Sequence, residues 1–164
     1  MKELIIWFGV LVGMILFAAW LQKGGYKLPE STNSSVEQTK SIKVGNTKKI
    51  DVEIADSPQK HEKGLSGRDS LSSGRGMLFI MQEDSMPTFW MKNMKFPIDI
   101  MWINDSIVVD ILENVPAQQE ETNDANLSRY RSQRAVDHVL EVTDGFIKTN
   151  GISIGDKVEL PEGI

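Results

Sequence analysis

The sequence predicts a mainly β domain, a compact antiparallel barrel or sandwich with short helices, preceded by one N-terminal transmembrane helix. Two observations predict the domain. Several short apolar or alternating segments follow one another closely, and no long helical pattern separates them. A third observation, an uncharged apolar run over residues 4–21, predicts the membrane helix.

The apolar run "LIIWFGVLVGMILFAAWL" extends from Leu4 to Leu21, and as a helix it approaches the thickness of the hydrocarbon core. A cleaved signal peptide would have a shorter apolar region and small residues at a cleavage site, which the end of this run lacks. We therefore expect an uncleaved signal anchor, with the cell membrane as partner. Lysines flank both ends, so charge does not orient it. An extracytoplasmic domain is expected because a short N-terminal anchor is the common arrangement for export.

A flexible linker is predicted over residues 22–41, which are rich in glycine, serine, threonine and charge and contain little to bury. The globular β domain is predicted over residues 42–164. Its first strand covers Ile50, Val52 and Ile54, which alternate with two acidic residues. A short helix follows, with Ser57 as cap, Pro58 first and Gly64 at the end.

The later elements are read from the same patterns. The run at 76–81 predicts a strand covered on both faces, "TFWM" starts another, and residues 98–111 predict a hairpin turning at Asn104-Asp105. Residues 118–132 are expected to form a polar loop. An alternating strand at 135–142, a helical turn at 143–151 and a last strand ending at 160 complete the domain.

Composition excludes several classes of function. The net charge of -5 disfavours non-specific binding of nucleic acid, which needs a basic surface. The chain has no cysteine, which excludes disulfides, thiolate nucleophiles and zinc–cysteine sites. It has two histidines, too few for a multi-histidine metal site. We therefore expect no metal and no cofactor.

Seven segments carry a resemblance to a known family: "VEIADSPQKHEKGLSGRDSL", "RGMLF", "FWMKN", "PIDIMWI", "ENVP", "RAVDHVLEV" and "GISIGDKVEL". In this order they resemble the bacterial and archaeal family called domain of unknown function 192, over about residues 49–160. The resemblance implies a compact β structure with short helices, often exported, and implies no activity. Two features depart from the family: Met94 stands where threonine is usual, and residues 118–132 lack the cysteines of many members.

The stretch "FWMKNMKFPIDIMW" contains the candidate site. Asp99 shares a strand face with Met101 and Ile103, and a carboxylate buried there needs a donor. Two interpretations remain open. The first is an ion pair that holds loops against the sheet, and the second is a pocket that binds a small polar or saccharide ligand. The hypothesis is that the candidate residues converge; they are Arg68, Arg75, Trp90, Asn93 and Asp99.

Six of the eight methionines fall between Met77 and Met101. Soft thioethers in an exported protein can bind Cu(I), but strand-spaced methionine more often fills a core, and core filling is the expectation.

No catalytic motif is present: the chain lacks GxSxG, HExxH, a P-loop and GxGxxG. His61 is expected on an exposed helix face. The predicted function is therefore a binding or accessory module at the cell envelope, and an enzyme is not the first expectation. Two alternatives stay open. One is a carboxylate-dependent hydrolase of an envelope polymer or saccharide, using Asp99 with Glu113 or His61. The other is a purely structural envelope protein.

Overall fold

The computed structural model describes residues 39–46, 49–118, 126–161 and 163–164. The predicted anchor over residues 4–21 and the linker as far as residue 38 lie outside the described residues. Within the described ranges, neither helix has the length and apolar character that crossing a membrane requires. The first strand, β1 (Thr39–Val44), begins three residues before the predicted start of the domain.

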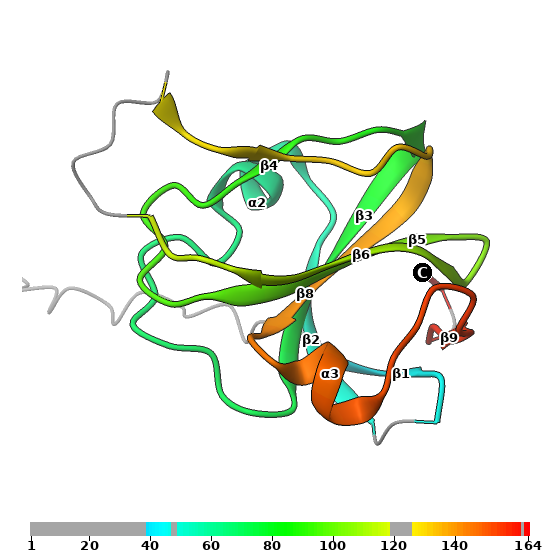
Figure 1. Cartoon of the computed structure of the whole chain (residues 1–164). Helices are drawn as coiled ribbons and strands as arrows, with labels where there is room; N and C mark the ends of the chain where they lie inside the picture. The colour runs from blue at the N-terminus through cyan, green and yellow to red at the C-terminus, as the bar shows by residue number, and fades with distance from the viewer. Residues whose placement is uncertain (1–38, 47–48, 119–125, 162) are drawn as a thin grey trace, which may run out of the picture. The chain divides into compact units, whose positions relative to one another are not determined.

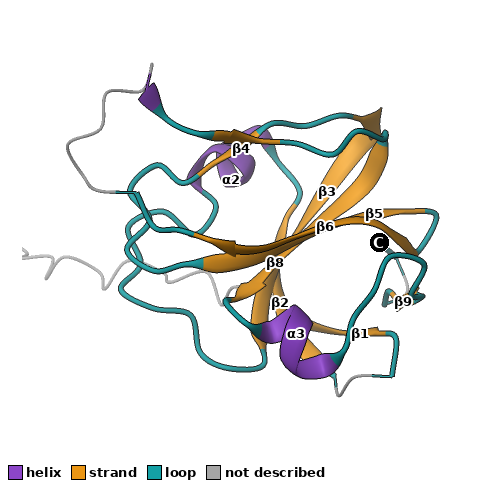
Figure 2. Cartoon of the chain, in the orientation of Figure 1, coloured by secondary structure: helices purple, strands orange, loops and turns teal. Residues whose placement is uncertain are grey.

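Seven strands form one curled sheet, a half-barrel (Figure 1). Their order across the sheet is β6 (Ile107–Val115), β5 (Ile98–Asn104), β8 (Val136–Thr143), β3 (Arg75–Ser85), β2 (Ile50–Ala55), β1 and β9 (Val158–Glu159). The β2–β3 pair is parallel and the other pairs are antiparallel. A separate two-stranded sheet joins β4 (Phe89–Trp90) to β7 (Arg129–Tyr130). The prediction of a mainly β domain with short helices is confirmed (Figure 2).

The short helix α2 (Pro58–Lys63) begins and ends where the sequence predicts. Ser57 is its N-cap, and its hydroxyl accepts the main-chain N–H of Lys60 at 3.4 Å. Pro58 takes the first position, where a missing N–H has no cost. Gly64 ends the helix at a φ of 47°, a conformation that favours glycine.

The hairpin between β5 and β6 turns one residue later than predicted. Asn104 pairs with Ile107, so the turn residues are Asp105 and Ser106, with φ values of 50° and 61°. Two consecutive residues with positive φ match the twist of the flanking strands in a two-residue hairpin. The predicted pair Asn104-Asp105 is therefore corrected to Asp105-Ser106.

The strand β8 was expected to alternate between buried and exposed residues, but six of its eight residues are buried. The physical reason is its place between β3 and β5, because such a central strand is covered on both faces. Glu53 of β2 departs from its pattern in the same way, since it faces away from Val52 and is still buried.

Each face of the sheet carries its own hydrophobic core. One core includes Val52, Leu78 and Met101 and contacts α3 (Phe146–Asn150) through Ile147. We call this side the α3 face. The opposite side, the α2 face, carries Phe79 and its cluster and is covered by α2, β4 and the segments around them (Figure 1). Successive strand residues alternate between these faces, so register decides which side chains meet.

The two ends of the strand order meet. Ile107 at the start of β6 forms an antiparallel bridge with Lys157, just before β9. Main-chain bonds run from Val108 N to Asp156 O and from Val158 N to Ser106 O, both at 2.8–2.9 Å. The curled sheet is therefore joined to itself at this corner.

Candidate functional site

A pocket of about 340 Å³ lies on the α2 face of the sheet. The end of α2 and the turn after it form one side, β3 forms the back, and the segment that contains β4 forms the other side. The lining combines aromatic and thioether side chains with polar and charged residues of α2 and the turn after it, among them Glu62 and Lys63, and Glu141 of β8 also reaches it. The residues used below are His61, Phe79, Met81, Phe89, Trp90, Met91, Met94 and Glu141.

The floor of this site is a row of side chains fixed by strand register. Glu53 of β2 pairs with Met77 of β3, and Met77 pairs with Glu141 of β8. Directly paired residues point to the same face, so both glutamates flank Met77 on the α2 face. Both are buried, at 5% and 6% exposure. Two carboxyl groups are therefore placed on one buried face of the sheet.

Arg68 binds one of these carboxyl groups. Its two terminal nitrogens donate to the two oxygens of Glu53 at 2.6 and 2.5 Å, the bidentate geometry that suits guanidinium and carboxylate. The loop that carries Arg68 is hydrogen bonded to a second loop. The Ser66 hydroxyl donates to Lys92 O at 2.6 Å, and Gly67 N donates to Asn93 O at 2.9 Å. Glu53 is thus a fixed, ion-paired carboxylate.

Glu141 is in a different state. No described residue donates a hydrogen bond to its carboxyl group, and burial raises its pKa to about 8, while the charge of Arg68 acts in the opposite direction. Burial disfavours the charged form of an acid, so Glu141 is mostly protonated at neutral pH. A neutral carboxyl can both donate and accept a hydrogen bond.

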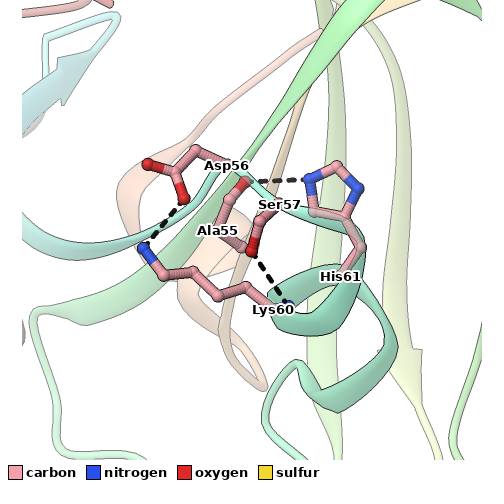
Figure 3. A network of polar contacts seen from close by, with 5 residues as sticks. All are labelled: Ala55, Asp56, Ser57, Lys60 and His61. Atoms are coloured by element: carbon pink, nitrogen blue, oxygen red, sulfur yellow. Dashed lines mark hydrogen bonds and ion pairs between the residues drawn. The ribbon is translucent and has the colours of Figure 1, made fainter.

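One wall of the pocket is aromatic, and Figure 3 shows how α2 positions its first ring. Nε2 of His61 lies 2.9 Å from the main-chain oxygen of Ala55, and because that oxygen only accepts, Nε2 carries the proton. Lys60 donates to Asp56 at 2.8 Å beside it. The His61 ring lies 5.8 Å from the Phe79 ring, and Phe79 meets Phe89 edge-on at 5.1 Å. His61 is therefore half-buried, which corrects the expected exposed position.

Three of the predicted site residues lie around this pocket or its loops. Trp90 lines it, is 38% exposed, and has the guanidinium of Arg129 5.7 Å from its ring centroid. Asn93 has a φ of 56° and acts through its main chain, whose oxygen binds Gly67 beside Arg68. Arg68 and Asn93 are thus adjacent through Gly67, and Trp90 precedes Asn93 by three residues.

Asp99 is placed elsewhere. Its partner in β8 is Val142, a member of the α3-face core, so its carboxylate lies on the side opposite Glu141. One oxygen accepts the N–H of Asn114 at 2.9 Å, and the other accepts the N–H of Ile147, in the first turn of α3, at 3.0 Å. Main-chain N–H groups therefore take the role expected of the arginines. Arg75 opens β3 opposite Asp51 of β2.

Asp99 and Glu113, the pair considered for a hydrolase, line one cavity of about 660 Å³ together with residues of α3. Glu113 is exposed and Asp99 is fully buried. His61, the other candidate partner, lines the pocket on the opposite face.

The methionines mostly fill cores, as predicted. Met77, Met91 and Met94 belong to the α2-face cluster and Met101 to the α3-face cluster, all at least 95% buried. Met81 packs against the first of these clusters, and Met86 is 55% exposed.

The residue that sequence reasoning missed is Glu141. It occurs in "HVLEV", and an acidic residue in an alternating strand normally faces water. The available signal was the strand's own apolar content, because an acid inside a strand covered on both faces has no solvent side.

Comparisons with known proteins agree on the family and the fold. The model of the family domain of unknown function 192 (DUF192), described as an uncharacterised ACR, matches residues 40–160. No curated protein matches the chain.

Two crystal structures are similar to the chain. A protein of Sinorhizobium meliloti 1021, described as a candidate transcription regulator, is 30% identical with a TM-score of 0.68, over 75% of this chain and 94% of that chain. A protein of unknown function from Novosphingobium aromaticivorans DSM 12444 is 29% identical with a TM-score of 0.69, over 78% of this chain and 89% of that chain.

Proposed function

Because the chain belongs to the DUF192 family, which is uncharacterised, we propose its function from its own site: the domain is a binding module that takes a small, mostly apolar molecule in the α2-face pocket, with the Glu141 carboxyl as its polar contact. The observation that carries this proposal is a buried carboxyl group that reaches the pocket and accepts no hydrogen bond from any described residue. Buried polar groups are nearly always hydrogen bonded, so a partner from outside the chain is the expected completion.

The lining defines the class of ligand. Phe79, Phe89 and Met91 offer apolar and polarizable surface, which favours a ring or a short alkyl group. A neutral carboxyl can donate to the oxygen of an amide, a ketone or an alcohol. An anion is disfavoured beside it, because burying a charge without a compensating charge is costly. We therefore propose a less polar ligand than the saccharide considered from the sequence.

A panel of benzene derivatives of similar size tests this ligand class. Acetophenone is a neutral molecule whose oxygen only accepts, benzoate is an anion and benzylamine is a cation. Binding is followed on the full-length, 15N-labelled chain by the amide signals of Gly64, Met91 and Glu141. Acetophenone is expected to bind most tightly at about pH 6 and about tenfold more weakly at about pH 9, where the ionised carboxyl cannot donate.

Two variants separate the carboxyl from the pocket shape. Glu141→Leu should abolish acetophenone binding, because an apolar side chain leaves the ligand oxygen unpaired. Glu141→Gln should keep binding and lose its pH dependence, since an amide both donates and accepts without titrating. The exposed Glu83→Gln serves as control and should change neither property. Benzoate binding as tightly as acetophenone, or acetophenone binding that ignores pH, would defeat the proposal.

We also propose that residues 4–21 hold this module at the membrane, with the domain on the extracytoplasmic side. The support is the uninterrupted apolar run and its lack of a cleavage site. We propose no nucleic-acid partner, in spite of the description of the Sinorhizobium relative, because the net charge of -5 opposes contact with phosphates.

The hydrolase and the purely structural envelope protein stay as alternatives. Asp99 and Glu113 share a cavity, which a two-carboxylate mechanism requires. We favour binding over hydrolysis because both oxygens of Asp99 accept hydrogen bonds from main-chain N–H groups. These two bonds give the carboxylate a structural role, since they hold β6 and α3 in place. Hydrolysis of a glycoside that is lost in Asp99→Asn while the protein stays folded would reverse this preference.

A further inference from the structure

The α2-face pocket contains a second ionisable group that the proposed function does not use, the imidazole of His61. Its Nε2 donates to the main-chain oxygen of Ala55 at 2.9 Å, which orients the ring and leaves Nδ1 as the unprotonated nitrogen. Figure 3 shows this second ring nitrogen on the side that faces away from Ala55, and no described residue hydrogen bonds it. A half-buried ring in the pocket wall therefore offers a lone pair that can accept a proton.

Strand register brings this base and the Glu141 carboxyl to Phe79 from opposite sides of β3. Ala55, which holds the His61 ring, pairs with Phe79 from β2. The partner of Phe79 in β8 is Val139, so Glu141 is the diagonal neighbour of Phe79 on the α2 face, with Cα atoms about 7–8 Å apart. The His61 and Phe79 ring centroids are 5.8 Å apart. A small ligand against the Phe79 ring would therefore have the imidazole towards one end and the carboxyl towards the other.

A neutral carboxyl and a neutral imidazole form the pair that proton transfer next to a carbonyl group requires. A carboxyl kept neutral by burial can donate to a ketone oxygen and stabilise the negative charge that develops on it. A neutral imidazole can take the proton from the neighbouring carbon. When both groups contact one ketone, the acid oxygen and the base nitrogen lie about 6–8 Å apart. A pocket of about 340 Å³ has room for this arrangement.

We propose that the α2-face pocket catalyses exchange between the keto and enol forms of a small apolar ketone, with Nδ1 of His61 as the base and the Glu141 carboxyl as the acid. A C–H bond next to the carbonyl breaks, its proton moves to Nδ1, and its electron pair forms the C=C bond of the enol. The carbonyl oxygen takes the proton of Glu141, so the step leaves an enol, an imidazolium and a carboxylate. The reverse step returns both protons to the ketone. This inference rests on the proposed function, because the ketone must first occupy the pocket, and it adds a reaction to binding.

Acetophenone tests the reaction, because its methyl hydrogens lie next to the carbonyl group. The full-length chain is incubated with acetophenone in D₂O at about pH 7, where a free imidazole is mostly neutral. Loss of the methyl signal in proton NMR measures the exchange, and the amide signals of Gly64 and Met91 report binding in a parallel sample in H₂O. Exchange should be at least about a hundredfold faster than with free imidazole at the same concentration, because the pocket positions both groups.

Two variants separate the reaction from binding. His61→Gln should still bind acetophenone but exchange its methyl hydrogens about a hundredfold more slowly, because an amide is not a base. Glu141→Gln should also keep binding and slow the exchange by about tenfold, because an amide donates a hydrogen bond without giving up its proton. The exposed Glu83→Gln is the control and should change neither binding nor exchange.

The two readouts distinguish failure of this inference from failure of the proposed function. Acetophenone that binds but exchanges no faster than with free imidazole overturns the inference and leaves the proposed function standing. Exchange that is unchanged in His61→Gln overturns it as well. A protein that neither binds acetophenone nor exchanges its methyl hydrogens defeats both proposals.

Discussion

Glu53 and Glu141 flank the same residue, Met77, on one buried face of the sheet, yet Arg68 hydrogen bonds Glu53 and not Glu141. One carboxylate is therefore held as an ion pair, and burial favours the neutral form of the other. Two side chains of the same type are thus given different roles by their environments, and each difference can be measured.

Glu141→Gln should remove a pH dependence of stability. The folded-state pKa of about 8 lies above the ordinary 4.5, so the folded state keeps a proton that the unfolded state loses between these values. Raising the pH through this window therefore favours unfolding, by up to about 4 kcal/mol at pH 8. Urea unfolding from acid to alkaline pH checks it: the wild type should lose stability relative to the glutamine variant. Parallel profiles for the two proteins would show that Glu141 is not held neutral, and Glu83→Gln is the control.

Arg68→Gln should destabilise the domain by about 3–5 kcal/mol, because Glu53 would remain buried without its guanidinium partner. The measurement is chemical denaturation at neutral pH. Lys60→Gln breaks an exposed helical pair with Asp56 and should cost no more than about 0.5 kcal/mol. Adding Glu53→Gln to the Arg68 variant should restore part of the loss. If the arginine and lysine variants are equally stable, the Glu53 pair has no structural role.

Asp99→Asn should lower stability by about 2 kcal/mol. The carboxylate accepts from Asn114 and from Ile147, and an amide offers only one acceptor oxygen, so one main-chain N–H would face an NH₂ group. Thermal unfolding with Asp69→Asn as the exposed control makes the comparison, since Asp69 is 91% exposed in its pair with Lys95. A melting temperature equal to that of the control would mean that these two bonds add nothing.

Full-length protein should fractionate with membranes and keep its N-terminus, since residues 4–21 form an uninterrupted apolar run. Cell fractionation followed by N-terminal sequencing is the measurement. A soluble mature form that starts after Ala19 would instead identify a cleaved signal peptide.

Titration with Cu(I) against a competing chelator should show no micromolar binding. Met77 and Met101 lie on opposite faces of the sheet, and the thioethers around the α2-face pocket pack against apolar side chains. Stoichiometric retention of Cu(I) that is lost when Met81 and Met91 are changed to leucine would contradict this expectation.

The parts of the fold that the sequence predicted are local. The limits of α2 depend on Ser57, Pro58 and Gly64, which act within one helical turn. The hairpin turn was predicted to within one residue. It is a local feature, because it depends on positive φ at two adjacent residues.

The site could not be read in the same way, because it depends on pairing between distant segments. Glu53, Met77 and Glu141 come from three strands, and a slip of one residue would move any of them to the other face. The partners of Asp99 are main-chain N–H groups, which every residue except proline carries. The sequence analysis considered side-chain donors, and it therefore predicted the arginines as partners of Asp99. The need of Asp99 for a donor was foreseen, but the identity of the donor carries no sequence signature.

The bridge between Ile107 and Lys157 has a consequence for behaviour in concentrated solution. An exposed strand edge offers unpaired N–H and C=O groups on which a second chain can assemble. Here the C-terminal segment is hydrogen bonded to Val108 of β6 and to Ser106 just before it, so it shields part of the row that would otherwise recruit a neighbouring copy. Proteolytic trimming of the last ten residues would unmask that row, and the domain would then be converted from a self-contained unit into a seed for edge-to-edge aggregation.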